Sequence, residues 1–349
     1  MKRRFLATIL AALTLAATLT GCGGGSTSSS TGGSTAAPAG SGASGAPEYT
    51  WKMHLNSTEG DNAYDMGALF AEKVSELTDG RVKVDLYGGA SLGSTSEVLE
   101  GMSVGVADIA VESVGTLATF TPLANIEAMP YMFNSYDHFM KVWYSDLGDE
   151  IKNTVGDAAG FKLMGAAYRG PRIVTATKEM RTIEDFKGFK LRAPNLEMYI
   201  KTWQWLDAAP TPMAMNEVYT ALQQKTVEGQ ENPMVDSLNY AFDEVCDYWI
   251  KTNHVYGCNV VIMDKGYFSG LPADIQDAVI EAANYAGKQI SEAQAAKDAK
   301  AEEELKSLGK TVIEVDNAAF AEYFKDFAST NYPDFSDWVV RIAEMDPAK

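Results

Sequence analysis

Two arginines twenty positions apart are the residues with the clearest chemical potential in this sequence. Arg172 follows a Gly-Pro pair, which predicts a turn, and Arg192 ends the segment "FKLR" shortly before a proline that stops a strand. A planar guanidinium group can bind a carboxylate through two parallel hydrogen bonds, a geometry that lysine does not reproduce. The two arginines therefore suggest an organic-anion site, although a lone arginine near a strand end more often forms a structural ion pair.

Signatures of catalysis and of bound cofactors are missing from the sequence. The histidines His54, His138 and His254 lie far apart, without metal-ligand spacing. There is no G-x-S-x-G nucleophile elbow and no Gly-rich phosphate loop, and nothing singles out a pair among the 47 acidic residues. We therefore expect no enzyme activity, no cofactor and no metal. An exported enzyme is the alternative, and no positive signal supports it.

The acidic composition restricts the partners of the protein. The 349 residues carry a formal net charge of −18, which argues against nucleic-acid binding and against adhesion to an anionic membrane surface. A small anionic ligand is still compatible with this charge, because salt screens exposed charges beyond roughly 8 Å and a local pair of arginines can dominate a cleft.

The N-terminal residues are typical of an export signal. "MKRR" precedes an apolar run, and the run ends in "LTGC", which resembles the lipobox of bacterial lipoproteins. We expect residues 1–21 to be removed and Cys22 to be lipidated, so that the protein is held at the extracytoplasmic face of a membrane or in the periplasm. An ordinary signal peptide with a chance cysteine is the alternative. The Gly/Ser/Thr-rich residues up to 47 are expected to form a tether.

Two further cysteines leave a disulfide open. Cys246 and Cys258 would be exposed to an oxidising compartment, in which a disulfide can form. Cys246 is expected in a helix and Cys258 at the start of a strand. We favour two separate buried thiols.

Alternating strand and helix patterns indicate an α/β protein. Residues 62–80 carry an apolar helical stripe, residues 82–87 alternate as a half-buried strand, and residues 254–264 form an apolar strand. A long Ala/Glu/Lys-rich helix is expected from about residue 273 to 308. Such alternation predicts parallel βαβ units in a two-lobed molecule, with a ligand beyond the carboxyl ends of strands, where Arg192 and Glu112 are both expected.

Several motifs in order resemble those of a known family. They include "GPRIVTATKEMRTIEDFKGFKLRAPN", "PTPMAMNEVYTALQ", "EGQENP" and "TNHVY", with "FAEKVSELTDGRVKVDLYGGASLG" earlier in the chain. Over about residues 50–345 the sequence resembles the DctP-type solute-binding proteins of tripartite ATP-independent periplasmic (TRAP) transporters. The resemblance implies a bilobed α/β periplasmic-binding-protein fold of type II, with a hinge and a long bracing helix, that delivers an organic acid to the membrane permease subunits.

The resemblance also implies roles for individual residues. Arg192 matches the arginine that forms the main salt bridge with the substrate carboxylate, Arg172 an assisting arginine, and Asn232 an asparagine that hydrogen-bonds the same anion. The remaining expected ligand-site residues are Glu112, Asn195 and Asn56, which meet hydroxyl or amine groups, Met215, which lines the apolar side, and His254, which is expected near the cleft as a hydrogen-bonding group rather than as a direct contact.

Glu112 and its neighbours constrain the ligand. A carboxylate in an anion site repels a second ligand carboxylate and accepts hydrogen bonds from hydroxyl groups, which favours a polyhydroxylated sugar acid such as a hexuronate. Val114 and Gly115 stand where sialic-acid binders of the family carry extra polar groups. The alternatives are a C4-dicarboxylate or keto-acid binder of the same family, and a lipoprotein that presents its ligand to a membrane sensor kinase.

The expected organisation has four parts, in a protein that we expect to be a monomer. They are the signal peptide 1–21, the lipidated cysteine with its tether 22–47, lobe I from residues 48–168 with about 258–300, and lobe II from residues 169–257 with the C-terminal segments.

Overall fold

A computed structural model of the chain describes residues 46–348. The expected signal peptide, the lipidation site Cys22 and the tether up to residue 45 lie outside the described residues. The strands are β1 (Tyr49–Leu55), β2 (Val82–Tyr87), β3 (Ile109–Ser113), β4 (Phe161–Ala176), β5 (Lys190–Ala193), β6 (Ala209–Pro212), β7 (Gly229–Pro233), β8 (Tyr248–Asp264) and β9 (Thr311–Glu314).

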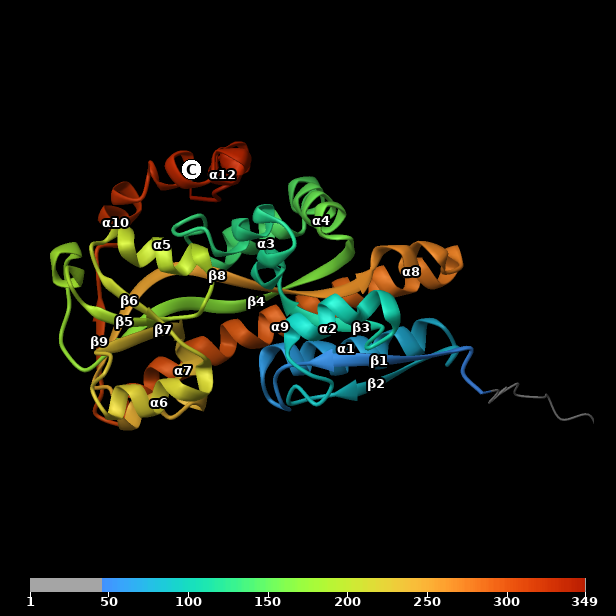
Figure 1. Cartoon of the computed structure of the whole chain (residues 1–349), viewed down its shortest axis with the longest axis horizontal. Helices are drawn as coiled ribbons and strands as arrows, with labels where there is room; N and C mark the ends of the chain where they lie inside the picture. Colours follow the sequence, from blue (N-terminus) through green and yellow to red (C-terminus); the bar gives the residue numbers. More distant parts are fainter. Residues whose placement is uncertain (1–45, 349) are drawn as a thin grey trace, which may run out of the picture. The chain divides into compact units, whose positions relative to one another are not determined.

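The strands form one mixed sheet in the order β2-β1-β3-β8-β4-β7-β5-β6, and β9 pairs with β8. The pairs β1–β2, β1–β3, β5–β6 and β5–β7 are parallel, as the alternating pattern predicts. The long strands β4 and β8 run antiparallel to each other, to β7 and to β3, and they join the two parallel halves of the sheet (Figure 1). The fold is thus α/β and two-lobed.

The β4–β8 ladder is irregular where it passes between the two halves. Its register shifts between Met164 and Ala167, between Tyr168 and Pro171, and between Arg172 and Val174. The expected Gly-Pro turn before Arg172 is therefore wrong, because Gly170 and Pro171 lie inside β4. A β-bulge tolerates both residues, since it leaves a position unpaired and admits the positive φ of 90° that Gly170 adopts.

Helices cover the sheet from both sides. The α-helices are α1 (Asn62–Leu77), α2 (Thr95–Gly101), α3 (Tyr136–Trp143), α4 (Asp146–Ala159), α5 (Glu197–Trp205), α6 (Met215–Gln223), α7 (Met234–Asn239), α8 (Lys265–Gly270), α9 (Ala273–Ser307), α10 (Asn317–Tyr323), α11 (Phe327–Asn331) and α12 (Ser336–Glu344). The 3₁₀ helices are η1 (Met102–Val104), η2 (Val114–Thr119), η3 (Pro122–Ala128), η4 (Ile183–Phe186), η5 (Phe242–Glu244) and η6 (Pro333–Phe335).

Helix α9 packs against both halves of the sheet. Its first turns bury Ile275 and Val279 with the core around β1 and α1, and its last turns bury Ala301 and Leu305 beside Trp249 of β8. The helix ends at Ser307, one residue before the predicted end. Figure 1 shows it running along the sheet from one half to the other. The expected bracing helix is confirmed.

Cys246 and Cys258 are both free and buried, so the structure has two separate thiols. Within residues 46–348, no helix is long and apolar enough to cross a membrane.

Candidate functional site

A cavity of about 250 Å³ lies where the two halves of the sheet meet. Its walls include the carboxyl ends of four strands, because Asn56 follows β1, Glu112 is near the end of β3, Arg192 is near the end of β5, and Asn232 is near the end of β7. Carboxyl ends of strands are the usual place for a ligand in an α/β sheet. The cavity residues are Asn56, Ser57, Asp61, Ala63, Glu112, Ser113, Thr116, Arg169, Arg172, Arg192, Pro194, Leu196, Tyr199, Met215, Asn232, Asp236, Tyr240 and Asn259.

Arg192 is a buried cation without a carboxylate partner among the described residues. Its side chain donates from Nε and Nη2 to the backbone oxygen of Met213, at 3.1 and 2.8 Å, and the residue is 4% exposed. Burial lowers the pKa of the guanidinium to about 10, although Glu231 acts in the opposite direction. An anion entering the cavity would supply the missing countercharge.

Arg172 has an internal partner instead. Its Nε and Nη2 donate to the two carboxylate oxygens of Glu231, Nη2 also donates to Asn232 Oδ1 at 2.9 Å, and the guanidinium lies 4.9 Å from the centroid of the Tyr199 ring. Burial opposes its charge, but Glu231 and Tyr199 outweigh burial and raise its pKa. The positive charge of Arg172 is thus largely neutralised by the protein itself.

Behind Arg172, His254 completes a buried network. His254 Nε2 lies 3.1 Å from the Glu231 carboxylate, and Nδ1 lies 2.9 Å from the hydroxyl of Thr252. Burial opposes the charge of Glu231, but Arg172 and His254 lower its pKa to about 2, while burial lowers the pKa of His254. His254 does not line the cavity; it supports the residue that holds Arg172.

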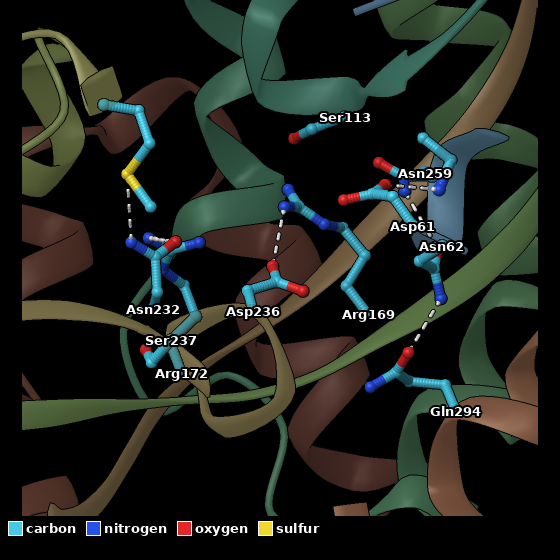
Figure 2. A network of polar contacts seen from close by, with 12 residues as sticks. Asp61, Asn62, Ser113, Arg169, Arg172, Asn232, Asp236, Ser237, Asn259 and Gln294 are labelled. Carbon is cyan, nitrogen blue, oxygen red and sulfur yellow. Dashed lines mark hydrogen bonds and ion pairs between the residues drawn. The ribbon is translucent and has the colours of Figure 1, made fainter. Parts of the chain in front are cut away.

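Asn232 is held in one orientation by its neighbours. Its Oδ1 accepts from Arg172 (Figure 2). Its Nδ2 donates to Gln230 Oε1 at 2.7 Å and lies 3.8 Å from the sulfur of Met215. Gln230 is itself fixed by donating to Thr175 and Ser237. Asn232 and Met215 both line the cavity, so the amide is oriented before any ligand binds.

Glu112 lines the cavity from the other half of the sheet. Its carboxylate accepts from the hydroxyl of Thr95 at 2.8 Å and lies 3.8 Å from His54 Nε2. Burial raises the pKa of Glu112 to about 7, although Thr95 and Arg169 act in the opposite direction. His54 is fully buried, and neither ring nitrogen has a hydrogen-bond partner within the described chain. Glu112 thus has capacity left for a ligand hydroxyl group.

Asn195 is the one predicted site residue that is both exposed and outside the cavity wall. It stands between β5 and α5, while its neighbours Pro194 and Leu196 line the cavity. The predicted residues that the structure brings together at the cavity are Arg192, Arg172, Asn232, Glu112, Met215 and Asn56.

Three charged cavity residues were not predicted from the sequence, namely Asp61, Arg169 and Asp236. Arg169 donates from Nη2 to the carboxylate of Asp236 at 3.4 Å, and both line the cavity. Residues three apart on a regular strand face opposite sides of the sheet, so Arg169 and Arg172 would not be expected together. The register shift between Tyr168 and Pro171 turns both side chains toward the cavity. No sequence signal for that shift stands out beyond the Gly-Pro pair.

The polar groups of this cavity are of the kind that can bind an anion. Within residues 46–348, no group of three or more histidine, cysteine, aspartate or glutamate side chains is arranged to hold a metal ion. The cavity instead offers one uncompensated guanidinium, an oriented amide and several carboxylates.

Comparison with known proteins identifies relatives along most of the chain. A sequence model of the DctP family, bacterial extracellular solute-binding protein family 7, matches residues 54–334. A solute-binding protein of Roseobacter denitrificans is 34% identical over 83% of this chain and 89% of its own length. The sialic acid-binding periplasmic protein SiaP of Vibrio cholerae is 29% identical over 80% of this chain and 88% of its own.

Solved structures agree with the sequence relatives. The same Roseobacter denitrificans protein, a TRAP periplasmic solute-binding protein with bound L-galactonate, matches with a TM-score of 0.77 and 31% identity over 86% of this chain and all of its own. A TRAP solute-binding protein of Polaromonas sp. JS666 bound to D-erythronate matches with a TM-score of 0.74 and 26% identity over 84% and 97% of the two chains.

Proposed function

Since the chain belongs to family 7 of the bacterial extracellular solute-binding proteins, we propose that it captures a sugar acid with one carboxylate, either an aldonate or a hexuronate, for a TRAP permease. Arg192 binds the carboxylate of the ligand, and Arg172 and Asn232 assist. Glu112 and Asn56 form hydrogen bonds with the hydroxyl groups of the ligand, and Met215 contacts its carbon chain. The protein performs no chemistry on its ligand.

The observation that carries this proposal is the uncompensated charge of Arg192. The guanidinium is buried at the cavity wall, its hydrogen bonds within the described chain go to a backbone oxygen, and no described carboxylate pairs with it. Removing a charged group from water is costly unless a countercharge is present. A ligand carboxylate would provide it, and hydrogen bonds to charged groups contribute roughly 1.5–3 kcal/mol each.

The relatives support a hydroxylated monocarboxylate. L-galactonate and D-erythronate, which two of the relatives bind, are aldonates. The carboxylates Asp61, Glu112 and Asp236 line this cavity as well and would disfavour a C4-dicarboxylate. For a nine-carbon sialic acid, Val114 and Gly115 would provide no polar side chains.

A calorimetric binding panel tests the proposal. Purified protein is titrated with aldonates, hexuronates, C4-dicarboxylates and keto acids, and then the Arg192→Ala and Arg192→Lys variants are titrated with the ligand that binds. We expect Arg192→Ala to lose roughly 2–5 kcal/mol of binding free energy, because the ligand anion would lose its partner in a closed cavity. Arg192→Lys should restore little, since an ammonium lacks the planar fork.

Two results would contradict the proposal. Equal affinity of the wild type and both Arg192 variants would remove Arg192 from the carboxylate site. Conversion of any sugar acid by the purified protein would instead favour an exported enzyme.

We also propose the membrane arrangement and the lobe boundaries predicted from the sequence. The lipidated Cys22 anchors the protein at the outer face of a membrane, and the tether up to residue 47 lets the monomer reach the permease. Lobe I comprises residues 48–168 with about 258–300, and lobe II comprises residues 169–257 with the C-terminal segments. The course of β4 and β8 between the halves of the sheet supports this division.

A further inference from the structure

The three guanidinium groups of the cavity have different charged neighbours. Arg192 interacts with Glu231, Arg172 and Tyr240. Arg169 interacts electrostatically with Asp236, Arg172, Glu127 and Asp61. Its charge also lowers the pKa of Glu112, against the effect of burial. Arg192 thus forms no ion pair with a carboxylate of the described residues, whereas Arg169 has an ion-paired carboxylate and further acidic neighbours.

Arg169 is occupied by acidic groups on several sides. Its contact with Asp236 measures 3.4 Å, and the two side chains are only 25% and 13% exposed. Asp61 caps the N-terminus of α1 by accepting from the backbone nitrogen of Ala63, and it also lines the cavity. Figure 2 shows Asp236 below the guanidinium of Arg169, joined to it by a dashed line, and Asp61 to its right.

The charges at the cavity wall leave room for one ligand carboxylate. Arg172 forms an ion pair with Glu231, and Arg169 forms one with Asp236. Among the described residues, no carboxylate forms an ion pair with the third cavity guanidinium, that of Arg192. Asp61 and Glu112 add negative charge to the surroundings of Arg169. A second ligand carboxylate there would meet like charges, and like-charge contacts are strongly unfavourable in a closed site.

We propose that the Arg169–Asp236 pair restricts this protein to sugar acids with a single carboxylate, and that Asp236 is the residue that determines this selectivity. The inference rests on the proposed function and specifies its ligand class. The end of the ligand away from Arg192 carries hydroxyl groups, which donate hydrogen bonds to the carboxylates around Arg169. Because Arg169 is ion-paired with Asp236, its guanidinium is not free to bind a second carboxylate of the ligand.

A matched ligand pair tests the selectivity. L-galactonate and galactarate share a carbon skeleton and differ only in the oxidation of C6, which adds the second carboxylate. Both are titrated by calorimetry into the wild type, Asp236→Asn and Asp243→Asn. Asparagine keeps the shape of aspartate, removes its charge and frees Arg169. Asp243 lies on η5 in the same half of the protein and does not line the cavity, so its variant controls for the loss of one negative charge.

We expect the wild type to bind L-galactonate and to bind galactarate far more weakly. In Asp236→Asn, the affinity ratio between L-galactonate and galactarate should fall by about tenfold or more, mainly through a gain for galactarate, because one like charge is removed and Arg169 is released. Asp243→Asn should keep the wild-type ratio. If Asp236→Asn does not fold, Asp236→Ser removes the same charge and is measured in its place.

The outcomes separate the two proposals. If the wild type binds L-galactonate and the ratio does not change in Asp236→Asn, the inference is overturned and the proposed function stands. Wild-type protein that binds galactarate as tightly as L-galactonate overturns the inference as well. If the wild type binds no sugar acid of the calorimetric panel, the proposed function fails, and this inference fails with it.

Discussion

At the scale of single residues, Arg172 and Arg192 have different roles in the cavity because their neighbours differ. Arg172 and Arg192 are both buried, yet Glu231 holds the first in a two-pronged ion pair while the second meets only a backbone oxygen. A guanidinium that is already paired contributes shape and hydrogen-bond direction more than charge. The ligand carboxylate is therefore expected at Arg192, with Arg172 and Asn232 defining its orientation.

Glu112 makes the stability of the ligand-free protein depend on pH. Its pKa is raised by burial from an ordinary 4.5 to about 7, so the folded state holds this proton more tightly than the unfolded state. The contribution of Glu112 to stability is complete below pH 4.5 and is lost as pH rises to about 7 and beyond. A shift of this size corresponds to about 3 kcal/mol.

We expect the wild type to lose stability relative to Glu112→Gln as pH rises from 5 to 8, because glutamine does not titrate. Urea unfolding of both proteins across this range measures the difference. A constant difference would show that the Glu112 pKa is close to its ordinary value. Arg169, Asp61, Thr95 and His54 surround the side chain of residue 112 in both proteins, so their own contributions largely cancel.

Six of the cavity residues were predicted, some from strand ends in the local pattern and the others from the family motifs. Arg192 and Glu112 end apolar strand segments, and the family motifs locate Asn232 and Met215. Arg169 and Asp236 were missed because their proximity depends on a shifted register in β4 and on the position of α7, which are tertiary features. Asn195 was expected at the cavity, but it is exposed beside it.

At the scale of elements, close contact between α9 and β4 joins the two halves. A Cβ atom at Gly287 of α9 would lie 2.5 Å from the Tyr144 hydroxyl and 2.7 Å from the backbone oxygen of Ala166. The Tyr144 hydroxyl already donates to that oxygen at 2.6 Å. Backbone atoms on β4 have little freedom to move, so this helix position requires glycine.

We expect Gly287→Ala to lower the free energy of unfolding by about 1–3 kcal/mol, because overpacking outweighs the better helix propensity of alanine. Gly270→Ala at the end of α8 is the matched control, since its Cβ would meet nothing within 4 Å. Urea unfolding midpoints measure both variants. If Gly287→Ala unfolded at the same urea concentration as Gly270→Ala, close packing of α9 on β4 would not be a constraint.

The elements themselves were predicted unevenly. The pattern for α9 extends over ten turns of Ala, Glu and Lys, and its bounds were predicted within one residue. By contrast, β8 begins at Tyr248, six residues before the predicted start, and β4 runs through the Gly170-Pro171 pair that predicted a turn. These strands depend on pairing with each other, which a local pattern does not record.

At the scale of the whole molecule, the charge and the N-terminal segment fit a protein that works outside the cytoplasm. The net charge of −18 suits neither nucleic acid nor an anionic membrane surface, so attachment would need a lipid. A sensor lipoprotein would present the same two lobes and the same cavity. The neighbouring genes distinguish transport from sensing. Genes for permease subunits next to the gene of this protein indicate transport, and a gene for a kinase indicates sensing.

The proposed anchor is tested by fractionation. We expect wild-type protein in the membrane fraction and Cys22→Ser in the soluble extracytoplasmic fraction, because the variant lacks the acceptor for the lipid. Both proteins should bind the sugar acid with the same affinity, since residue 22 lies outside the family match at residues 54–334. Wild-type protein in the soluble fraction would favour an ordinary signal peptide.

The packing of Trp203 against His254 has a practical consequence. Their rings lie edge to face with centroids 4.9 Å apart, and His254 contacts Glu231, which in turn holds Arg172. Indole emission responds to the local electric field, and an anion that settles between the arginines changes that field. The intrinsic fluorescence of this buried tryptophan should therefore report occupancy of the cavity without an attached dye.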